Sequence, residues 1–400
     1  MESTPEARHH RVVIVGGGSA GISVAARLKK ADRSLDVAII EPSETHYYQP
    51  IWTLVGGGDF NREDSKQPQS EVIPAGVAWI KAGMASIEAS ANTVITTTGD
   101  RISYDVVVLA LGIQIDWNVI PGLSESVGKP GSGVCSNYSY ETVNSTWDAI
   151  RNFTGGTAIF TQPGTPIKCG GAPQKIMYLA DDAFRKQGVR DRAEIKFCTA
   201  APSIFAVKKY ADGLMKVIDR KGIEPLWTHN LVAIDPDNKV ATFQHDGQDV
   251  AIPYDLLHVT PPMSAPDVLK ASGLGNEGGW VNVDKHTTQH LNHPNVFSLG
   301  DCSSLPTSKT GAAIRAQAPV TAANVMHHLH GESLSASYDG YTSCPLVTGY
   351  GSLILAEFDY DLVPKETFPF DQGKERWSMY MLKKHLLPPM YWHGMLRARA

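Results

Sequence analysis

Five cysteines are the residues of this 400-residue chain best suited to redox chemistry. They stand at positions 135, 169, 198, 302 and 344, and no two of them form a Cys-x-x-Cys pair, so a zinc ribbon and a thioredoxin-like motif are excluded. Cys169 in KCGGAP and Cys344 in TSCPLV have Gly or Pro beside them, which predicts a turn or loop leaving a strand at each. A sparse and odd set of cysteines is typical of a reducing compartment, with room for one functional pair.

Basic side chains near these cysteines add two candidates. Lys168 and Lys175 flank Cys169, where either could lower the pKa of a thiol or attract an anion, although a solvated lysine is an equally ordinary interpretation.

The histidines of DKHTTQHLNHP (residues 284–294) have a spacing that suits a metal on a helix. That segment runs into a strand and ends in His-Pro, so the spacing loses its meaning and we expect no metal site.

The elements that position these residues begin with RVVIVGGGSAGISVAARLKK, which predicts a strand, a glycine turn and an amphipathic helix. Gly16, Gly18 and Gly21 fit Gly-x-Gly-x-x-Gly. In this motif the first glycine makes the turn, the second admits a pyrophosphate and the third lets helix and strand pack closely. Ser19 and Ala20 open the helix, whose free N–H groups favour phosphate.

Three later pieces decide which dinucleotide is bound. Glu41 ends the strand of LDVAIIEP 20 residues after Gly21, where an acid accepts ribose hydroxyls and disfavours a 2′-phosphate. YDVVVLALGIQ and HPNVFSLGDCSS then predict two more strands, and SKTGAA opens a helix. These segments resemble the later FAD-binding segments of two-dinucleotide-domain flavoproteins, so we expect FAD. The predicted FAD set is Gly16, Gly18, Ser19, Ala20, Gly21, Glu41, Gln49, Met84, Gly112, Gly300, Asp301, Lys309, Thr310, Gly311 and Ala312.

The strand–turn–helix pattern restarts near residue 155, but its turn, PGTPIKCGG, has two prolines and a thiol in place of a nicotinamide glycine loop. We therefore predict an α/β fold with two Rossmann-like dinucleotide-binding domains, of the disulfide-reductase type, plus a C-terminal membrane-facing region. The expected division is an FAD domain (1–120 and 285–332), a second Rossmann-like domain (121–284) and a C-terminal quinone and membrane region (333–400).

Long strings of the chain resemble the sulfide:quinone oxidoreductases, in particular the mitochondrial-type branch and its bacterial relatives. They include HYYQPIWTLVGGG, KCGGAPQKIMYL, LHVTPPMSAPDVL, GDCSSLPTSKT, YDGYTSCPLVTGY and ETFPFDQGKER. The resemblance covers nearly the whole chain. It implies that Cys169 and Cys344 form a redox-active disulfide over the flavin, and that Cys344 receives the sulfur of sulfide. Cys198 and Cys302 are expected to be packing residues, and Cys135 is an open candidate for a third thiol.

The resemblance also implies the partners. They are hydrogen sulfide, ubiquinone or menaquinone, a sulfane-sulfur acceptor such as sulfite, glutathione or another thiol, and a membrane surface. The quinone candidates are Leu346, Tyr350, Phe358 and Tyr360. The last thirty or so residues, rich in Trp, Tyr, Leu, Met and cations, suit a membrane headgroup region. We expect them to form an interfacial platform, through which quinone reaches the flavin, at the bacterial cytoplasmic or mitochondrial inner membrane, although a helix closing the core or a dimer contact would give the same composition.

Composition removes some alternatives and leaves others. The net charge of −5 gives no basic field for nucleic acid. No run of 18 apolar residues is present, so we expect no membrane-spanning helix, and the first strand starts too early for a signal peptide. With the C-terminal composition, we expect a peripheral membrane protein. A type II NADH:quinone reductase, a flavocytochrome-type sulfide dehydrogenase subunit and a non-catalytic FAD-binding signalling module stay as alternatives. A homo-oligomer is left open.

Overall fold

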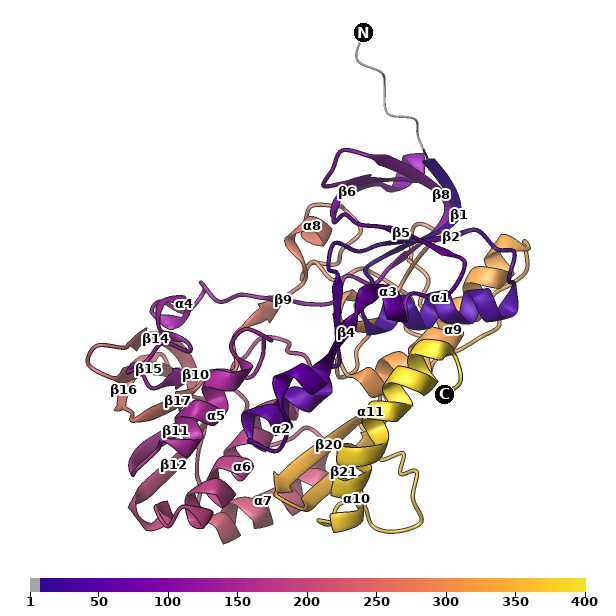
Figure 1. Ribbon diagram of the computed structural model, residues 1–400. Helices are drawn as coiled ribbons and strands as arrows, with labels where there is room; N and C mark the ends of the chain where they lie inside the picture. Colours follow the sequence, from indigo (N-terminus) through magenta and orange to yellow (C-terminus); the bar gives the residue numbers. More distant parts are fainter. Residues whose placement is uncertain (1–7) are drawn as a thin grey trace.

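The structure is a computed structural model that describes residues 8–400. Figure 1 shows two α/β bodies and a C-terminal helical segment (yellow) that runs from one of them to the other. The α/β fold with two dinucleotide-binding units agrees with the prediction.

The first body is built on a seven-stranded sheet in the order β5-β2-β1-β8-β7-β6, with β19 also paired to β8. Its strands are β1 (Arg8–Val15), β2 (Val37–Ile40), β5 (Val77–Ile80), β6 (Met84–Glu88), β7 (Thr93–Thr96), β8 (Arg101–Leu109) and β19 (Val296–Ser298). The run from Val12 to Val15 is fully buried, as expected for a strand between two parallel neighbours, β2 and β8. The helices α1 (Ser19–Ala31) and α9 (Gly311–Leu329) lie side by side against this sheet (Figure 1).

The second body is a five-stranded parallel sheet in the order β10-β17-β11-β12-β13. Its strands are β10 (Val134–Cys135), β11 (Gly156–Gln162), β12 (Ala193–Thr199), β13 (Glu224–Trp227) and β17 (Leu256–His258). The helices α5 (Val143–Arg151), α6 (Ala172–Lys186) and α7 (Lys208–Lys221) belong to it. The helix α6 follows β11 through the loop that carries Cys169, so this unit repeats the strand–loop–helix order of the first.

A two-stranded antiparallel hairpin, β20 (Thr342–Gly349) and β21 (Ser352–Phe358), follows α9. Cys344 lies inside β20, whereas the sequence predicted a turn there. The prediction relied on the adjacent Pro345 as a sign of a turn. Proline is tolerated in a two-stranded ribbon, however, because every strand there is an edge strand.

Residues 377–397, which we call the C-terminal segment, form one irregular helix against both bodies. Its parts are α10 (Trp377–Met381), the π-helical η6 (Leu382–Leu386), α11 (Leu387–Pro389), the π-helical η7 (Met390–Gly394) and η8 (Met395–Arg397). Pro388 and Pro389 lack the N–H groups of regular helical bonding, which accounts for π-type turns on both sides of them.

Shorter elements complete the description. The strands are β3 (Thr45–Tyr47), β4 (Lys66–Pro68), β9 (Gln114–Ile115), β14 (Asn230–Asp235), β15 (Val240–His245), β16 (Gln248–Pro253) and β18 (Met263–Ser264). The helices are α2 (Trp52–Gly56), α3 (Gln69–Val72), α4 (Leu123–Ser126) and α8 (Asp267–Lys270), and the 3₁₀ turns are η1 (Gln49–Ile51), η2 (Arg62–Ser65), η3 (Ala89–Ala91), η4 (Arg190–Arg192) and η5 (Gly300–Cys302). We retain the division into residues 1–120 with 285–332, 121–284 and 333–400 as a proposal. Sheet membership supports it, because β19 joins the first sheet across the whole second body.

Candidate active site

The fold brings two of the five cysteines together. Sγ of Cys169, on the loop between β11 and α6, lies 3.8 Å from Sγ of Cys344 on β20, although 175 residues separate them in sequence. Both thiols are free. Cys344 is fully buried and Cys169 is partly exposed. The two residues that the resemblance paired are therefore neighbours at a junction of the two bodies and the hairpin.

The loop that carries Cys169 is held by the first body. The Cys169 backbone N–H donates to the Lys309 carbonyl at 2.7 Å, and the Cys169 carbonyl accepts from the N–H of Ala172 at 2.7 Å. Cys169 has φ of +57°, in the left-handed region that residues other than glycine seldom adopt. Such strain persists where surrounding contacts enforce it and is frequent at functional sites. The sulfur is thus positioned by main-chain contacts across the junction.

The two thiols have different acidities. The hydrogen bond from Cys344 and the nearby ammonium of Lys175 hold the pKa of Cys169 well below its usual value. Nζ of Lys175 donates to the Cys169 sulfur at 3.2 Å, and Lys175 itself is buried. The same bond to Cys169, together with burial, raises the pKa of Cys344. Cys169 is therefore the more acidic thiol of the pair and Cys344 the less acidic one.

The sequence did not predict that a third lysine, Lys383, would lie near the two thiols. Burial and the charge of Lys175 lower the pKa of Lys383 to about 7, while both thiols act on Lys383 in the opposite direction. It donates to the Pro50 carbonyl at 3.1 Å. No local signal could have identified Lys383, because KKHLL resembles the polar face of any surface helix.

Of the two lysines that flank Cys169 in sequence, only Lys175 contacts the thiol. Lys168 points to the other side and donates to Oε1 of Gln49 at 2.7 Å and to the Tyr138 carbonyl at 2.9 Å. Burial lowers the pKa of Lys168 to about 8, against the raising effect of the charge of Asp301. Lys168 and Gln49 therefore belong with the predicted FAD residues more than with the sulfur pair.

The glycine loop after β1 has the geometry of a phosphate cradle. A Cβ added at Gly16, which has φ of +105°, would collide with the Ala110 carbonyl, and one at Gly21 would collide with the Gly16 carbonyl. A Cβ at Gly18 would meet nothing within 4 Å, so this residue faces open space. Gly18 caps α1 without any side-chain bond, and the first N–H groups of the helix lack intrahelical partners. This loop and Ser19–Ala20 fit a pyrophosphate.

The remaining FAD candidates surround this loop. Glu41 follows β2 and accepts from the Gly17 N–H at 2.7 Å. Gly112 follows β8 with φ of +78° and faces open space. Gly300 and Asp301 follow β19, and burial raises the pKa of Asp301. Ligands of open α/β sheets bind outside the carboxyl ends of the strands, and these residues stand there.

The segment 309–312 opens the helix α9 beside that edge. Oγ1 of Thr310 accepts from the N–H of Ala313 at 3.0 Å, which caps the helix, and Gly311 faces open space. Lys309 donates to the Asp301 carbonyl at 2.5 Å. Ala312 lies in the first turn of α9, and Met84 begins β6, four residues after β5 ends. This collection fits an adenine dinucleotide that extends from the glycine loop toward Cys169.

The four quinone candidates are not gathered in one place. Leu346 is buried in β20 below Gly171, and Tyr350 sits at the hairpin turn, where its hydroxyl donates to the Gly57 carbonyl. Phe358, at the far end of β21, pairs with Thr342, and the hydroxyl of Tyr360 donates to the Lys285 carbonyl at 2.6 Å. Packing within the hairpin explains the alternating apolar residues of β20 and β21 as well as a quinone pocket does.

The other cysteines are buried apart from the pair. Burial raises the pKa of Cys135 and of Cys198 to about 12, and it also raises that of Cys302. Cys135 lies on β10 in register with His258 and makes no sulfur–sulfur contact within the part of the chain that the structure describes. In residues 8–400 no group of three or more His, Cys, Asp or Glu is placed to hold a metal.

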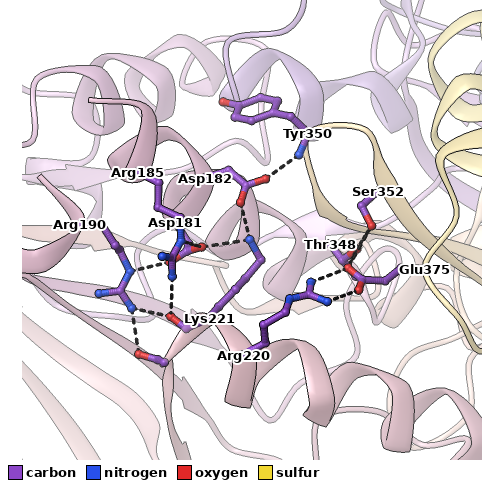
Figure 2. Close-up of polar contacts among 11 residues, drawn as sticks. Asp181, Asp182, Arg185, Arg190, Arg220, Lys221, Thr348, Tyr350, Ser352 and Glu375 are labelled. Carbon is purple, nitrogen blue, oxygen red and sulfur yellow. Dashed lines mark hydrogen bonds and ion pairs between the residues drawn. The ribbon is translucent and has the colours of Figure 1, made fainter. Parts of the chain in front are cut away.

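An ion-pair network joins the helix α6 to the turn of the hairpin, as Figure 2 shows. Asp181 on α6 is fully buried and pairs with Arg185, Arg190 and Lys221. The adjacent Asp182 pairs with the same Lys221 and accepts from the Tyr350 N–H at 2.8 Å. The network therefore links α6, which starts three residues after Cys169, to Tyr350, which follows the strand of Cys344.

Fold, glycine loop and dithiol together define a class: a flavoprotein of the disulfide-reductase type whose second unit presents a thiol. A family profile described as pyridine nucleotide-disulphide oxidoreductase matches residues 10–146. The chain is 50% identical over 392 residues to the mitochondrial sulfide:quinone oxidoreductase of Mus musculus, covering 97% of this chain and 87% of that protein. The corresponding protein of Dictyostelium discoideum is 47% identical over 97% of this chain and 86% of its own length.

One solved structure supports the fold. The sulfide:quinone oxidoreductase of Aquifex aeolicus superposes with a TM-score of 0.80 at 19% identity, covering 97% of this chain and 92% of that chain. The chain belongs to the sulfide:quinone oxidoreductase family, as the sequence resemblance predicted. It is an FAD-binding oxidoreductase, in agreement with the predicted cofactor.

Proposed function

We propose that this chain oxidises hydrogen sulfide through Cys169 and Cys344 and passes the two electrons, by way of FAD, to a membrane quinone. The observation that carries the proposal is the contact of the two sulfurs at 3.8 Å, with the buried Lys175 at 3.2 Å from Cys169. The relatives of this chain in Mus musculus and Dictyostelium discoideum are named as oxidoreductases of sulfide and quinone.

The sulfur chemistry follows from the unequal acidities of the pair. In the oxidised pair, hydrosulfide attacks Sγ of Cys344; a new S–S bond forms there, the bond to Cys169 breaks, and its electron pair leaves on Cys169 as a thiolate. A leaving thiol of lower pKa departs faster, which favours Cys169 in that role. The hydrosulfide proton stays on the new persulfide, and the burial of Cys344 shields it from water.

The sulfane sulfur then passes to a nucleophilic acceptor, such as sulfite or a thiol: the persulfide bond breaks, its electron pair stays on Sγ of Cys344, and the persulfide proton moves to that sulfur, whose pKa is raised. Lys175 is the cation that offsets the thiolate of Cys169 in this buried site, and negative charge on the pair favours the protonated form of Lys383. When bound, FAD supplies a two-electron acceptor that can later reduce a quinone. Lys168, Asp301 and Lys309 would hold its flavin end, and the glycine loop its pyrophosphate.

We assign the quinone and membrane side to the C-terminal segment and the hairpin. Trp377, Leu386 and Met390 are the large apolar residues of this segment that stay exposed, at 66%, 61% and 38%. Lys384 and Arg397 flank them, a composition that suits a headgroup region. In residues 8–400 no helix is both long and apolar enough to cross a bilayer. Peripheral attachment at the mitochondrial inner membrane is our proposal, from the mitochondrial relatives.

A type II NADH:quinone oxidoreductase is the nearest alternative, and proteins with that activity are among the more distant relatives. That reaction needs a nicotinamide site, and the loop where its glycines would stand carries Cys169 instead. The deciding experiment is anaerobic titration of the FAD-loaded protein, followed by flavin absorbance. Bleaching by sulfide and not by NADH supports the proposal, and bleaching by NADH alone refutes it.

A further inference from the structure

The C-terminal segment is packed on the FAD-binding body. Tyr391, Trp392 and Leu396 are buried, with at most 8% of each exposed. From α1, Arg27 donates to the Met395 carbonyl at 3.3 Å and to the carbonyl of the final residue, Ala400, at 2.6 Å. Figure 1 shows this part of the chain lying across α1. Removing it would therefore expose the helix that follows the glycine loop.

Tyr391 connects this segment to the glycine loop itself. Its hydroxyl lies 2.7 Å from Oγ of Ser19, the first residue of α1, and 2.5 Å from Nε2 of His46. His46 reaches the Gly17 carbonyl through Nδ1 at 3.1 Å, and Gln69 donates to that carbonyl at 2.8 Å. The ring of Tyr391 packs on Tyr48 with centroids 4.6 Å apart.

The direction of each hydrogen bond in this series of contacts can be worked out. The Gly17 carbonyl can only accept, so Nδ1 of His46 donates to it. Burial lowers the pKa of His46 to about 4, so the ring is neutral and its Nε2 accepts. The Tyr391 hydroxyl therefore donates to His46 and accepts from the Ser19 hydroxyl. The Ser19 side chain is thereby turned to the protein interior, and its backbone N–H stays available at the start of α1.

We propose that Tyr391 is a positioning residue for FAD: it holds the Gly17–Ser19 turn in the conformation that presents the N–H groups of Gly18 and Ser19 to the pyrophosphate. Three consecutive glycines give this turn wide conformational freedom, so an external restraint is needed to keep one conformation. Glu41 restrains the Gly17 N–H, and the pair of His46 and Tyr391 restrains its carbonyl. The inference rests on FAD binding and not on the identity of the electron donor or acceptor.

The test is FAD retention by Tyr391→Phe, which keeps the ring and its packing and removes the hydroxyl. FAD release is followed by the recovery of flavin fluorescence on dilution, and apo-protein is titrated with FAD. We expect affinity to fall about tenfold, the effect of one or two lost hydrogen bonds. The matched control is Tyr380→Phe, which removes a hydroxyl of the same segment that donates to Asp59 at 2.6 Å, outside the glycine loop. It should retain FAD as the unmodified protein does.

A second variant guards against a general loss of folding. Ser19→Ala removes the other end of the series of hydrogen bonds, and the double variant with Tyr391→Phe should cost little more than either single change. If Tyr391→Phe binds FAD within twofold of the unmodified protein, or if the two changes multiply fully, the proposal is overturned. Because FAD release requires no sulfide, this result is independent of the proposed reaction.

Discussion

The loop after β1 and the loop after β11 each join a strand to a helix in two similar units, but they carry different chemical groups. The first has three glycines, faces open space at Gly18 and leaves the N-terminus of α1 free. The second contains prolines and places Cys169, a thiol of lowered pKa, three residues before α6 starts. A helix N-terminus favours a phosphate and a thiolate for the same electrostatic reason. One scaffold therefore serves binding or redox chemistry according to what its loop places at the start of the helix.

The two loops also depend on each other. Cys169 is held by the Lys309 carbonyl, which belongs to the segment that opens α9 in the FAD-binding body. The loop that carries Cys169 is therefore held by a contact from the first body, whereas the glycine loop is restrained by Glu41, His46 and the C-terminal segment. Variants of either loop can show whether the glycine loop affects only FAD binding and the loop of Cys169 only the thiol chemistry.

Cys169→Ser should have the largest effect. We expect sulfide-driven flavin bleaching to fall on the order of 10³-fold or more, the scale of losing a residue whose bonds change in the reaction, while FAD stays bound. Stopped-flow absorbance after anaerobic sulfide addition measures it. Cys198→Ser, a buried thiol of β12, is the control and should bleach normally. Normal turnover by Cys169→Ser would remove the mechanism.

Gly18→Val should lower the affinity for FAD about a hundredfold or more, because a side chain there fills the space that a pyrophosphate needs. The flavin-to-protein ratio after gel filtration measures this. Gly170→Ala changes the other loop, and its Cβ would meet its nearest neighbour, Oγ of Ser308, at 3.9 Å. It should keep FAD. Equal flavin loss in both variants would contradict the separation of roles.

Glu41→Ala should weaken FAD retention about ten- to hundredfold, since a lost hydrogen bond to a charged group costs about 1.5–3 kcal/mol. The variant frees the Gly17 N–H as well as a ribose partner. Equilibrium titration of apo-protein with FAD gives the value. Glu44→Ala, an exposed acid of the same loop that pairs with Lys81, should bind FAD normally. An unchanged affinity in Glu41→Ala would place the ribose elsewhere.

Lys175→Met should raise the pKa of Cys169, because it removes a cation that contacts the thiolate. Alkylation of the reduced protein by iodoacetamide should then need a higher pH. Its rate at neutral pH should fall about tenfold for every tenfold loss of the thiolate fraction, and the pH–rate profile gives the midpoint directly. Lys168→Met is the control, since Lys168 contacts Gln49 instead. An identical midpoint in Lys175→Met would mean that other groups set the acidity.

Much of the site was accessible from the sequence, and the omissions have a common cause. The glycine spacing, Glu41 and the Gly-Asp pair are local patterns whose chemistry depends on neighbours within a few residues. The resemblance to a known family also paired Cys169 with Cys344. Lys383, His46 and Tyr391 were missed, because each acts on residues far away in sequence or on a backbone carbonyl, with no local pattern to show it.

The cofactor class and the strand–turn–helix units could be predicted from the sequence, because they depend on residue type and short-range spacing, whereas the two candidate redox cysteines were paired by the resemblance alone. The acidity of Cys169 could not, since its cause is a buried lysine and a second sulfur that folding brings together across 175 residues. The place of the C-terminal segment on the FAD-binding body also required the folded chain. An amphipathic composition is the same whether its apolar face meets a membrane or α1, and packing alone separates the two.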